Sequence, residues 1–115
     1  MMDKNSLKKM MPTFAAAFKT AIQLLASLRT VEVYGYKDLI KDITALKQTH
    51  PEAKSAYVKR DSEGTTWSLT LVLLDADKQI LKDKKGTAAG VKFRLNQFDE
   101  ELNSLFGNED DLFIK

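Results

Sequence analysis

The chain has 115 residues, of which 43% are hydrophobic and 30% are charged, with a net charge of +2. This length suits one domain with a single core, and the apolar content is too high for a wholly disordered chain. The absence of cysteine excludes disulfides, thiolate metal sites and thiol nucleophiles. No uninterrupted apolar run approaches the roughly 18 residues of a membrane span, and no signal peptide is evident. We therefore expect a cytoplasmic protein that does not associate with a membrane.

Charge is segregated along the chain. Residues 1–95 carry 17 Lys and Arg against 10 Asp and Glu, whereas residues 96–115 carry one Lys against six acidic residues. A basic body attracts polyanions, and an acidic end can compete for the same surface. The asymmetry therefore points to a nucleic-acid partner or to a regulatory tail.

The first predicted element is a helix that begins at Met11 or Pro12 and ends near Leu28. The apolar stripe that predicts it starts at Leu7, in a separate turn or frayed extension before the helix, and recurs in alternating steps of four and three: Leu7, Met11, Phe14, Phe18, Ala21, Leu25 and Leu28. Such a stripe is typical of a core helix packed on a sheet or a second helix, and a coiled-coil dimer is the alternative.

Two further elements are predicted before the chain changes period. Residues 31–34 alternate β-branched side chains with others and predict a short strand. Residues 36–48 place their apolar side chains on one helical face, and Pro51 ends this second helix at His50 because the residue before proline avoids the helical conformation. These elements complete the predicted N-terminal helices.

From Ala56 onward the hydrophobic period changes from 3.6 to 2, which indicates a sheet. The predicted strands are 56–60, 65–75, 78–82 and 91–95, and the turn between the first two is placed at 61–64. A C-terminal helix is predicted from the N-cap Asn96 to Gly107.

These elements predict an α+β fold with N-terminal helices, an antiparallel β-meander of three to four strands and a C-terminal helix. Residues 31–34 are the candidate for one further short strand. We expect a single domain over 1–107 and an acidic, hydrophobic tail over 108–115.

No residues with catalytic spacing stand out. His50 is the only histidine and lies at a predicted helix end, so the sequence gives no support for a histidine-based catalytic relay. Asp75 and Asp77 lack the glycine and glutamate positions of a calcium loop. The Gly86–Gly90 segment has no Gly-Lys-Ser/Thr and leads into a strand rather than a helix. We therefore expect no enzymatic activity, no metal and no cofactor.

The leading functional hypothesis is a small accessory protein that binds nucleic acid through a basic sheet face. Alternation places Ser68 and Thr70 on the outward side of the sheet, where small polar and basic residues suit a phosphate backbone. The candidate contacts are Lys59, Arg60, Lys84, Lys85, Lys92 and Arg94. An ordinary solvated face would have the same pattern.

The alternative hypothesis is a protein-interaction module, such as an inhibitor, immunity or adaptor protein. It would act through the first helix or through the tail, where Leu112, Phe113 and Ile114 follow three acidic residues. A protein partner or a homodimer is expected in that case. The same three residues would equally suit a last edge strand of the sheet.

Overall fold

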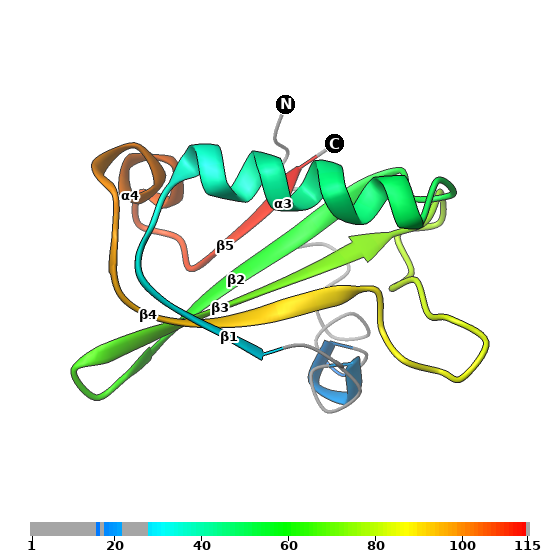
Figure 1. Cartoon of the computed structure of the whole chain (residues 1–115), viewed down its shortest axis with the longest axis horizontal. Helices are drawn as coiled ribbons and strands as arrows, with labels where there is room; N and C mark the ends of the chain where they lie inside the picture. The colour runs from blue at the N-terminus through cyan, green and yellow to red at the C-terminus, as the bar shows by residue number, and fades with distance from the viewer. Residues whose placement is uncertain (1–15, 17, 22–27, 115) are drawn as a thin grey trace.

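The computed structural model describes residues 16, 18–21 and 28–114. Five strands form one sheet in the order β1-β4-β3-β2-β5, and two helices complete the labelled elements (Figure 1). In chain order the elements are β1 (Leu28–Tyr34), α3 (Tyr36–Thr49), β2 (Ser55–Glu63), β3 (Thr66–Leu74), β4 (Gly90–Phe98), α4 (Glu100–Phe106) and β5 (Asp111–Ile114). The fold is α+β, as predicted.

The sheet is mixed, so the prediction of a purely antiparallel arrangement is wrong. β2, β3 and β4 form the expected antiparallel meander, but β1 pairs with β4 in parallel. The predicted short strand at 31–34 is therefore real and longer than expected. The parallel direction of this strand could not be predicted from a local pattern, because it depends on pairing between segments far apart in the chain.

The two faces of the sheet differ in composition and cover. In β3, Leu69, Leu71 and Leu73 belong to the main core, which lies on the side of α3. The alternate positions, Ser68 and Thr70 among them, point to the opposite side, named here the second face. Figure 1 shows α3 on one side of the sheet and helical residues 18–21 on the other.

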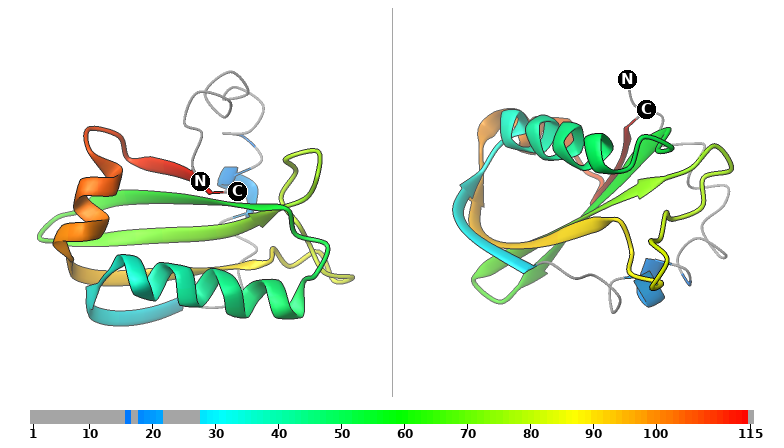
Figure 2. Two further views of the ribbon diagram at one scale, coloured as in Figure 1. Left: turned by 90° about the horizontal axis from the view of Figure 1, so that it is seen from above. Right: turned by 45° about the vertical axis from the view of Figure 1, so that its right-hand side comes forward.

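Helix α3 confirms the second predicted helix to within one residue. Leu39 and Ile43 are buried in the main core, one turn apart on a single face. Figure 2 shows α3 running along the strands beside β1. The helix ends at Thr49, and the His50 backbone amide donates to the Leu46 carbonyl as the C-cap.

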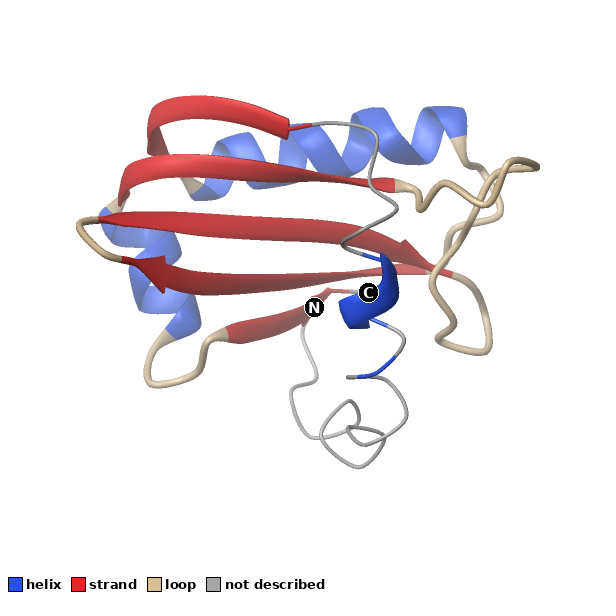
Figure 3. Cartoon of the chain, turned by 90° about the horizontal axis from the view of Figure 1, so that it is seen from below, coloured by secondary structure: helices blue, strands red, loops and turns tan. Residues whose placement is uncertain are grey.

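A smaller cluster occupies part of the second face. Phe18 is buried there with Tyr57, Val72, Leu74 and Phe113, and the Phe18 and Tyr57 rings meet edge to face at 5.1 Å. Figure 3 shows helical residues 18–21 against this side of the sheet. Phe18 is thus a core residue, as its place in the helical stripe predicts.

The predicted end of the first helix at Leu28 is wrong. Leu28 is the first residue of β1, and its side chain is 63% exposed. The other residues of the predicted stripe, apart from Phe18 and Ala21, lie outside the described residues.

The last helix begins three residues later than predicted. Asn96 remains in β4, because β4 continues beside β1 as far as the Tyr34–Phe98 pair. The N-cap is Asp99, whose Oδ1 accepts a hydrogen bond from the Leu102 amide at 2.8 Å. Gly107 ends the helix with a φ of 57°, as the C-terminal glycine predicts.

The β2–β3 turn is shorter than predicted. Asp61–Glu63 belong to β2, and Glu63 pairs with Thr66, so only Gly64 and Thr65 form the turn. Gly64 has a φ of 68°, a conformation that glycine adopts without strain. This extension of β2 carries two acidic side chains onto the sheet.

The predicted strand 78–82 is reduced to two isolated bridges, Leu74 with Ile80 and Lys82 with Ala88. Two turns of the same construction flank it. Asp75 Oδ1 accepts from the Asp77 and Gln79 amides, and Asp83 Oδ1 accepts from the Lys85 and Thr87 amides. The fourth residue of each turn has positive φ, and it is Lys78 in the first turn but Gly86 in the second.

The C-terminal segment forms the edge strand β5. It pairs antiparallel with β2, and Leu112, Phe113 and Ile114 are all buried. Leu112 joins the main core, whereas Phe113 joins the cluster on the second face. Of the two alternatives for this segment, a free tail and an edge strand, the structure contains the edge strand.

Candidate functional site

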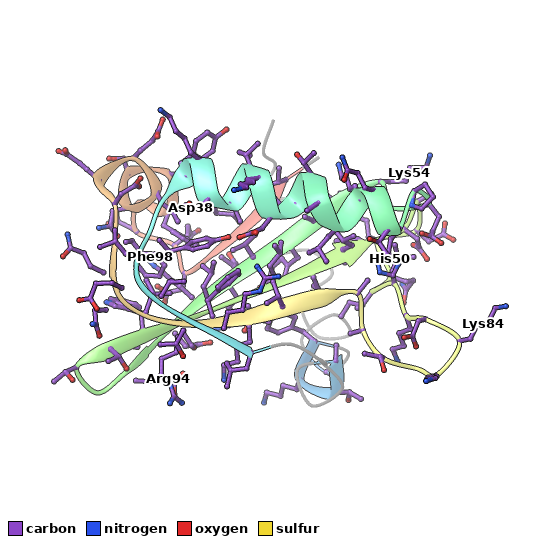
Figure 4. All side chains as sticks on the ribbon, viewed as in Figure 1. Asp38, His50, Lys54, Lys84, Arg94 and Phe98 are labelled. Atoms are coloured by element: carbon purple, nitrogen blue, oxygen red, sulfur yellow. The ribbon has the colours of Figure 1, made fainter. Side chains whose placement is uncertain are left out.

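Three of the candidate nucleic-acid contacts come together on the second face. Thr70 lies in register between Lys59 of β2 and Lys92 of β4, and Ser68 lies beside Arg94. This juxtaposition is the one that strand alternation predicts. Figure 4 shows the Arg94 side chain on the side of the sheet opposite α3.

Acidic residues share this face with the cations. Lys59 Nζ lies 2.7 Å from Asp61 Oδ1, and Lys92 Nζ lies 3.9 Å from Glu63 Oε1. Glu32 of β1 lines the same shallow hollow as Arg94, about 330 Å³ in volume. Lys59 and Lys92 are thus each close to a carboxylate, and Arg94 shares its hollow with a third. Sequence reasoning missed this balance because it assigned Asp61 and Glu63 to a turn.

The hydroxyls expected beside the cations are poorly accessible. Ser68 is 2% exposed and Thr70 is 1% exposed. A phosphate group would therefore meet long charged side chains on this face rather than hydroxyl groups.

Arg60 lies on the opposite face from Lys59 and is engaged by the fold. Its guanidinium stands 4.4 Å from the Phe106 ring centroid and 5.4 Å from that of Trp67. It also donates to Asn103 Oδ1, Asp110 Oδ1 and the carbonyls of Gly107 and Glu109. With a side chain only 11% exposed, Arg60 joins β2 to α4 and the loop that follows it.

Lys84 and Lys85 sit on the second of the two matched turns. Figure 4 shows Lys84 at one end of the long axis, well away from Arg94. The structure therefore divides the six candidate cations among three places: the second face, the α4 contact and this turn.

The outer edge of β1 is a feature that sequence reasoning missed. β1 is a terminal strand of the sheet, and none of the described residues pairs with its outer side. Leu28 and Val33 are 63% and 48% exposed, and both belong to this strand. The opposite terminal strand, β5, is only four residues long and buries its apolar side chains. The strand signal at 31–34 was visible in the sequence, but its position at an edge was not.

A groove between β1 and α3, named here the β1–α3 groove, runs beside this edge. One part, about 250 Å³, is lined by residues of β1, α3 and β4, including Arg29, Val33, Tyr34 and Asp42. A second part, about 220 Å³, shares Arg29 and Asp42 and continues toward the start of β4. Residues of β1 thus line the groove on one side and, in the described part of the chain, form the outer edge of the sheet on the other.

A hydrogen bond and an ion pair, both to Asp42 of α3, connect the two sides of the groove. Tyr34 donates its hydroxyl to Asp42 Oδ2 at 2.6 Å, and Arg29 lies 3.7 Å from Asp42 Oδ1 and 6.0 Å from the Phe93 ring centroid. Burial, followed by the hydrogen bond to Asp42, raises the pKa of Tyr34 well above its usual range. Tyr34 therefore remains a neutral donor at physiological pH and holds Asp42 in place.

The described residues contain no group of three or more His, Asp or Glu side chains positioned to hold a metal ion. His50 lies at the end of α3, with Nδ1 4.0 Å from Glu52 Oε1. None of the helices in the described part of the chain is long and apolar enough to cross a membrane. Comparison of the chain with protein-family models, with curated proteins and with solved structures gives no match.

Proposed function

We propose that this protein is a non-enzymatic protein-interaction module that binds an extended segment of its partner along the β1 edge. The observation that carries the proposal is the outer side of β1, with which none of the described residues pairs and where Leu28 and Val33 are exposed, beside the β1–α3 groove. An unpaired edge presents a row of backbone donors and acceptors that a second strand can satisfy.

The groove supplies what backbone pairing alone lacks. In strand addition, backbone hydrogen bonds provide affinity, and pockets for alternate side chains provide specificity. Val31 and Val33 offer apolar contact in the groove, while Arg29 and Lys41 stand at its sides. A bound strand would place every second side chain in this groove.

Selection from a displayed library of random peptides tests the proposal. We expect enriched peptides to alternate apolar and polar residues, and to bind the wild-type chain in a fluorescence anisotropy titration. Val33→Asp should weaken their binding at least about tenfold, because it places a charge in the groove. Ile40→Asp is the matched control, since Ile40 is 37% exposed but is not among the groove-lining residues. Equal binding by both variants would contradict the proposed site.

Nucleic-acid binding through the second face is the second candidate function. The observation that favours it is the group formed by Lys59 of β2 and by Lys92 and Arg94 of β4, on the two strands that flank β3. The neighbouring carboxylates weaken the positive potential of this face, so the affinity for a phosphate backbone should be low. Anisotropy titrations with single- and double-stranded oligonucleotides at low and physiological salt test it. Salt-sensitive binding that Arg94→Glu abolishes would support it, and the absence of binding at low salt would exclude it.

A further inference from the structure

We propose that the partner of the β1 edge is a second copy of this chain, so that two sheets join through antiparallel β1 strands about a twofold axis. This inference rests on the proposed function, because it names the occupant of the same edge. It is carried by two oppositely charged side chains, Glu32 and Arg94, that such pairing brings together. Within the described residues, neither side chain has a hydrogen bond or ion pair.

The sequence of β1 favours one register. A twofold axis perpendicular to the sheet keeps the two α3 faces on the same side, so paired residues must have the same parity. Pairing Val31 with Val31 of the second copy sets Thr30 opposite Glu32 and Arg29 opposite Val33. A shift that centres the axis on Glu32 instead would oppose two glutamates, which is destabilising.

The favoured register creates two symmetric charge contacts. Arg94 of β4 lies beside Thr30 of β1, and Thr30 would lie beside Glu32 of the second copy. Two strand spacings separate the backbones of Arg94 and that glutamate, about 10 Å, which these two long side chains can span over the small threonine. The contact occurs twice because of the twofold symmetry.

The same register covers apolar surface at the β1 edge. Val31 would contact its own copy, and the half-exposed Val33 would be covered by the aliphatic part of Arg29. Helix α3 lies on one face of the sheet, where it contacts β3 and bounds the groove with β1, whereas the proposed pairing extends the sheet in its own plane.

Sedimentation equilibrium of the full chain, over about 1 µM to 1 mM, measures the association. We expect the wild-type chain to approach twice its 13.0 kDa mass. Glu32→Arg alone and Arg94→Glu alone should each weaken the dimer about tenfold, because each variant sets like charges against each other at both contacts. An equimolar mixture of the two variants should associate as well as the wild type, since both contacts then join opposite charges.

The matched control uses a charge pair of the same face that lies within one chain. Glu63→Arg and Lys92→Glu, which separate the Lys92–Glu63 pair, should leave the association unchanged. A dimer that both Glu32→Arg and Arg94→Glu leave intact would overturn the proposal, because it would use another surface. A wild-type chain that stays monomeric while selected peptides bind the β1 edge would overturn self-pairing and leave the proposed function standing. A monomer that binds no peptide would contradict both.

Discussion

Gly35 lies directly against the carboxyl group of Asp99, so that a methyl group on its Cα would stand 2.7 Å from the Asp99 Cγ. Gly35 is the N-cap of α3 and Asp99 is the N-cap of α4. The Asp99 amide also donates to the Tyr34 carbonyl at 3.0 Å. The two helices therefore begin at one point, where β1 and β4 end side by side. Gly35 has extended backbone geometry, with a φ of −120°, so it is required here for space rather than for conformation.

Gly35→Ala should destabilise the protein by about 1 to 3 kcal/mol, because the added methyl group overlaps the Asp99 side chain. Asp99→Ser keeps a capping oxygen but is shorter, so the double variant should be more stable than the sum of the single effects predicts. Urea unfolding of the four chains measures this coupling. Strict additivity would show that the two residues do not contact each other.

Arg60→Lys should lower the free energy of unfolding by about 2 kcal/mol. Lysine cannot reproduce the planar set of donors that joins Asn103, Asp110 and two backbone carbonyls over three aromatic rings. Lys59→Met is the control from the adjacent position, and it should change stability by less than about 0.5 kcal/mol because the Lys59 ion pair is exposed. Equal unfolding free energies for Arg60→Lys and wild type would contradict a structural role.

The two matched turns both predict that glycine is more stable than alanine at the fourth position, where φ is positive. Lys78 has a φ of 60°, where a side chain is strained, but its Nζ lies 4.6 Å from the Phe113 ring centroid. Lys78→Gly and Lys78→Ala both lose that contact, so Lys78→Gly should be the more stable by about 1 kcal/mol. Gly86→Ala should lose about 1 kcal/mol at the corresponding position. Thermal unfolding compares the three variants, and a Lys78→Ala chain as stable as Lys78→Gly would argue against strain.

Phe113→Ala should destabilise the chain by about 3 to 5 kcal/mol, because the ring is 2% exposed within the cluster on the second face. Ile40→Ala, at a partly exposed position on α3, should cost far less. Chemical denaturation provides the values. A small effect of Phe113→Ala would indicate that the C-terminal segment leaves the sheet in solution.

Stability should fall at alkaline pH through two buried tyrosines. Burial, followed by hydrogen bonds to Asp42 and Asp111, raises the pKa of Tyr34 and Tyr57 in the folded chain well above the unfolded value of about 10. Below pH 10 both states are neutral and stability is unaffected. Above pH 10 only the unfolded chain loses these protons, so the unfolding free energy drops by up to about 1.4 kcal/mol per pH unit for each tyrosine.

Tyr34→Phe isolates one of these contributions. It removes one ionisable group, so its unfolding free energy should decline less steeply above pH 10 than that of the wild type, as measured by urea unfolding at several pH values. An identical slope for the two chains would show that Tyr34 ionises as freely when folded as when unfolded.

The local sequence determined the elements whose hydrophobic periodicity or end residues can be recognised within a short stretch of chain. The apolar face of Leu39 and Ile43 fixed α3 to within one residue, and the alternation of Leu69 and Leu71 fixed β3 and the face of its neighbours. The end of α4 at Gly107 was likewise predicted, because a glycine commonly ends a helix. These features depend on periodicity and on backbone conformation, which neighbouring residues decide.

Where each strand lies in the sheet was decided by tertiary contacts. β1 at one edge, β5 at the other and the parallel β1–β4 pair all join segments that are distant in sequence, so no local pattern encodes them. The extension of β4 past Asn96 follows from its pairing with β1. The extension of β2 places Asp61 and Glu63 on the second face. Arg60 and Lys59 are adjacent in sequence but lie on opposite faces, and only packing against α4 makes one of them structural. Among residues 28–114, β1 has no strand on its outer side, and this too follows from the order of the strands in the sheet rather than from any local pattern.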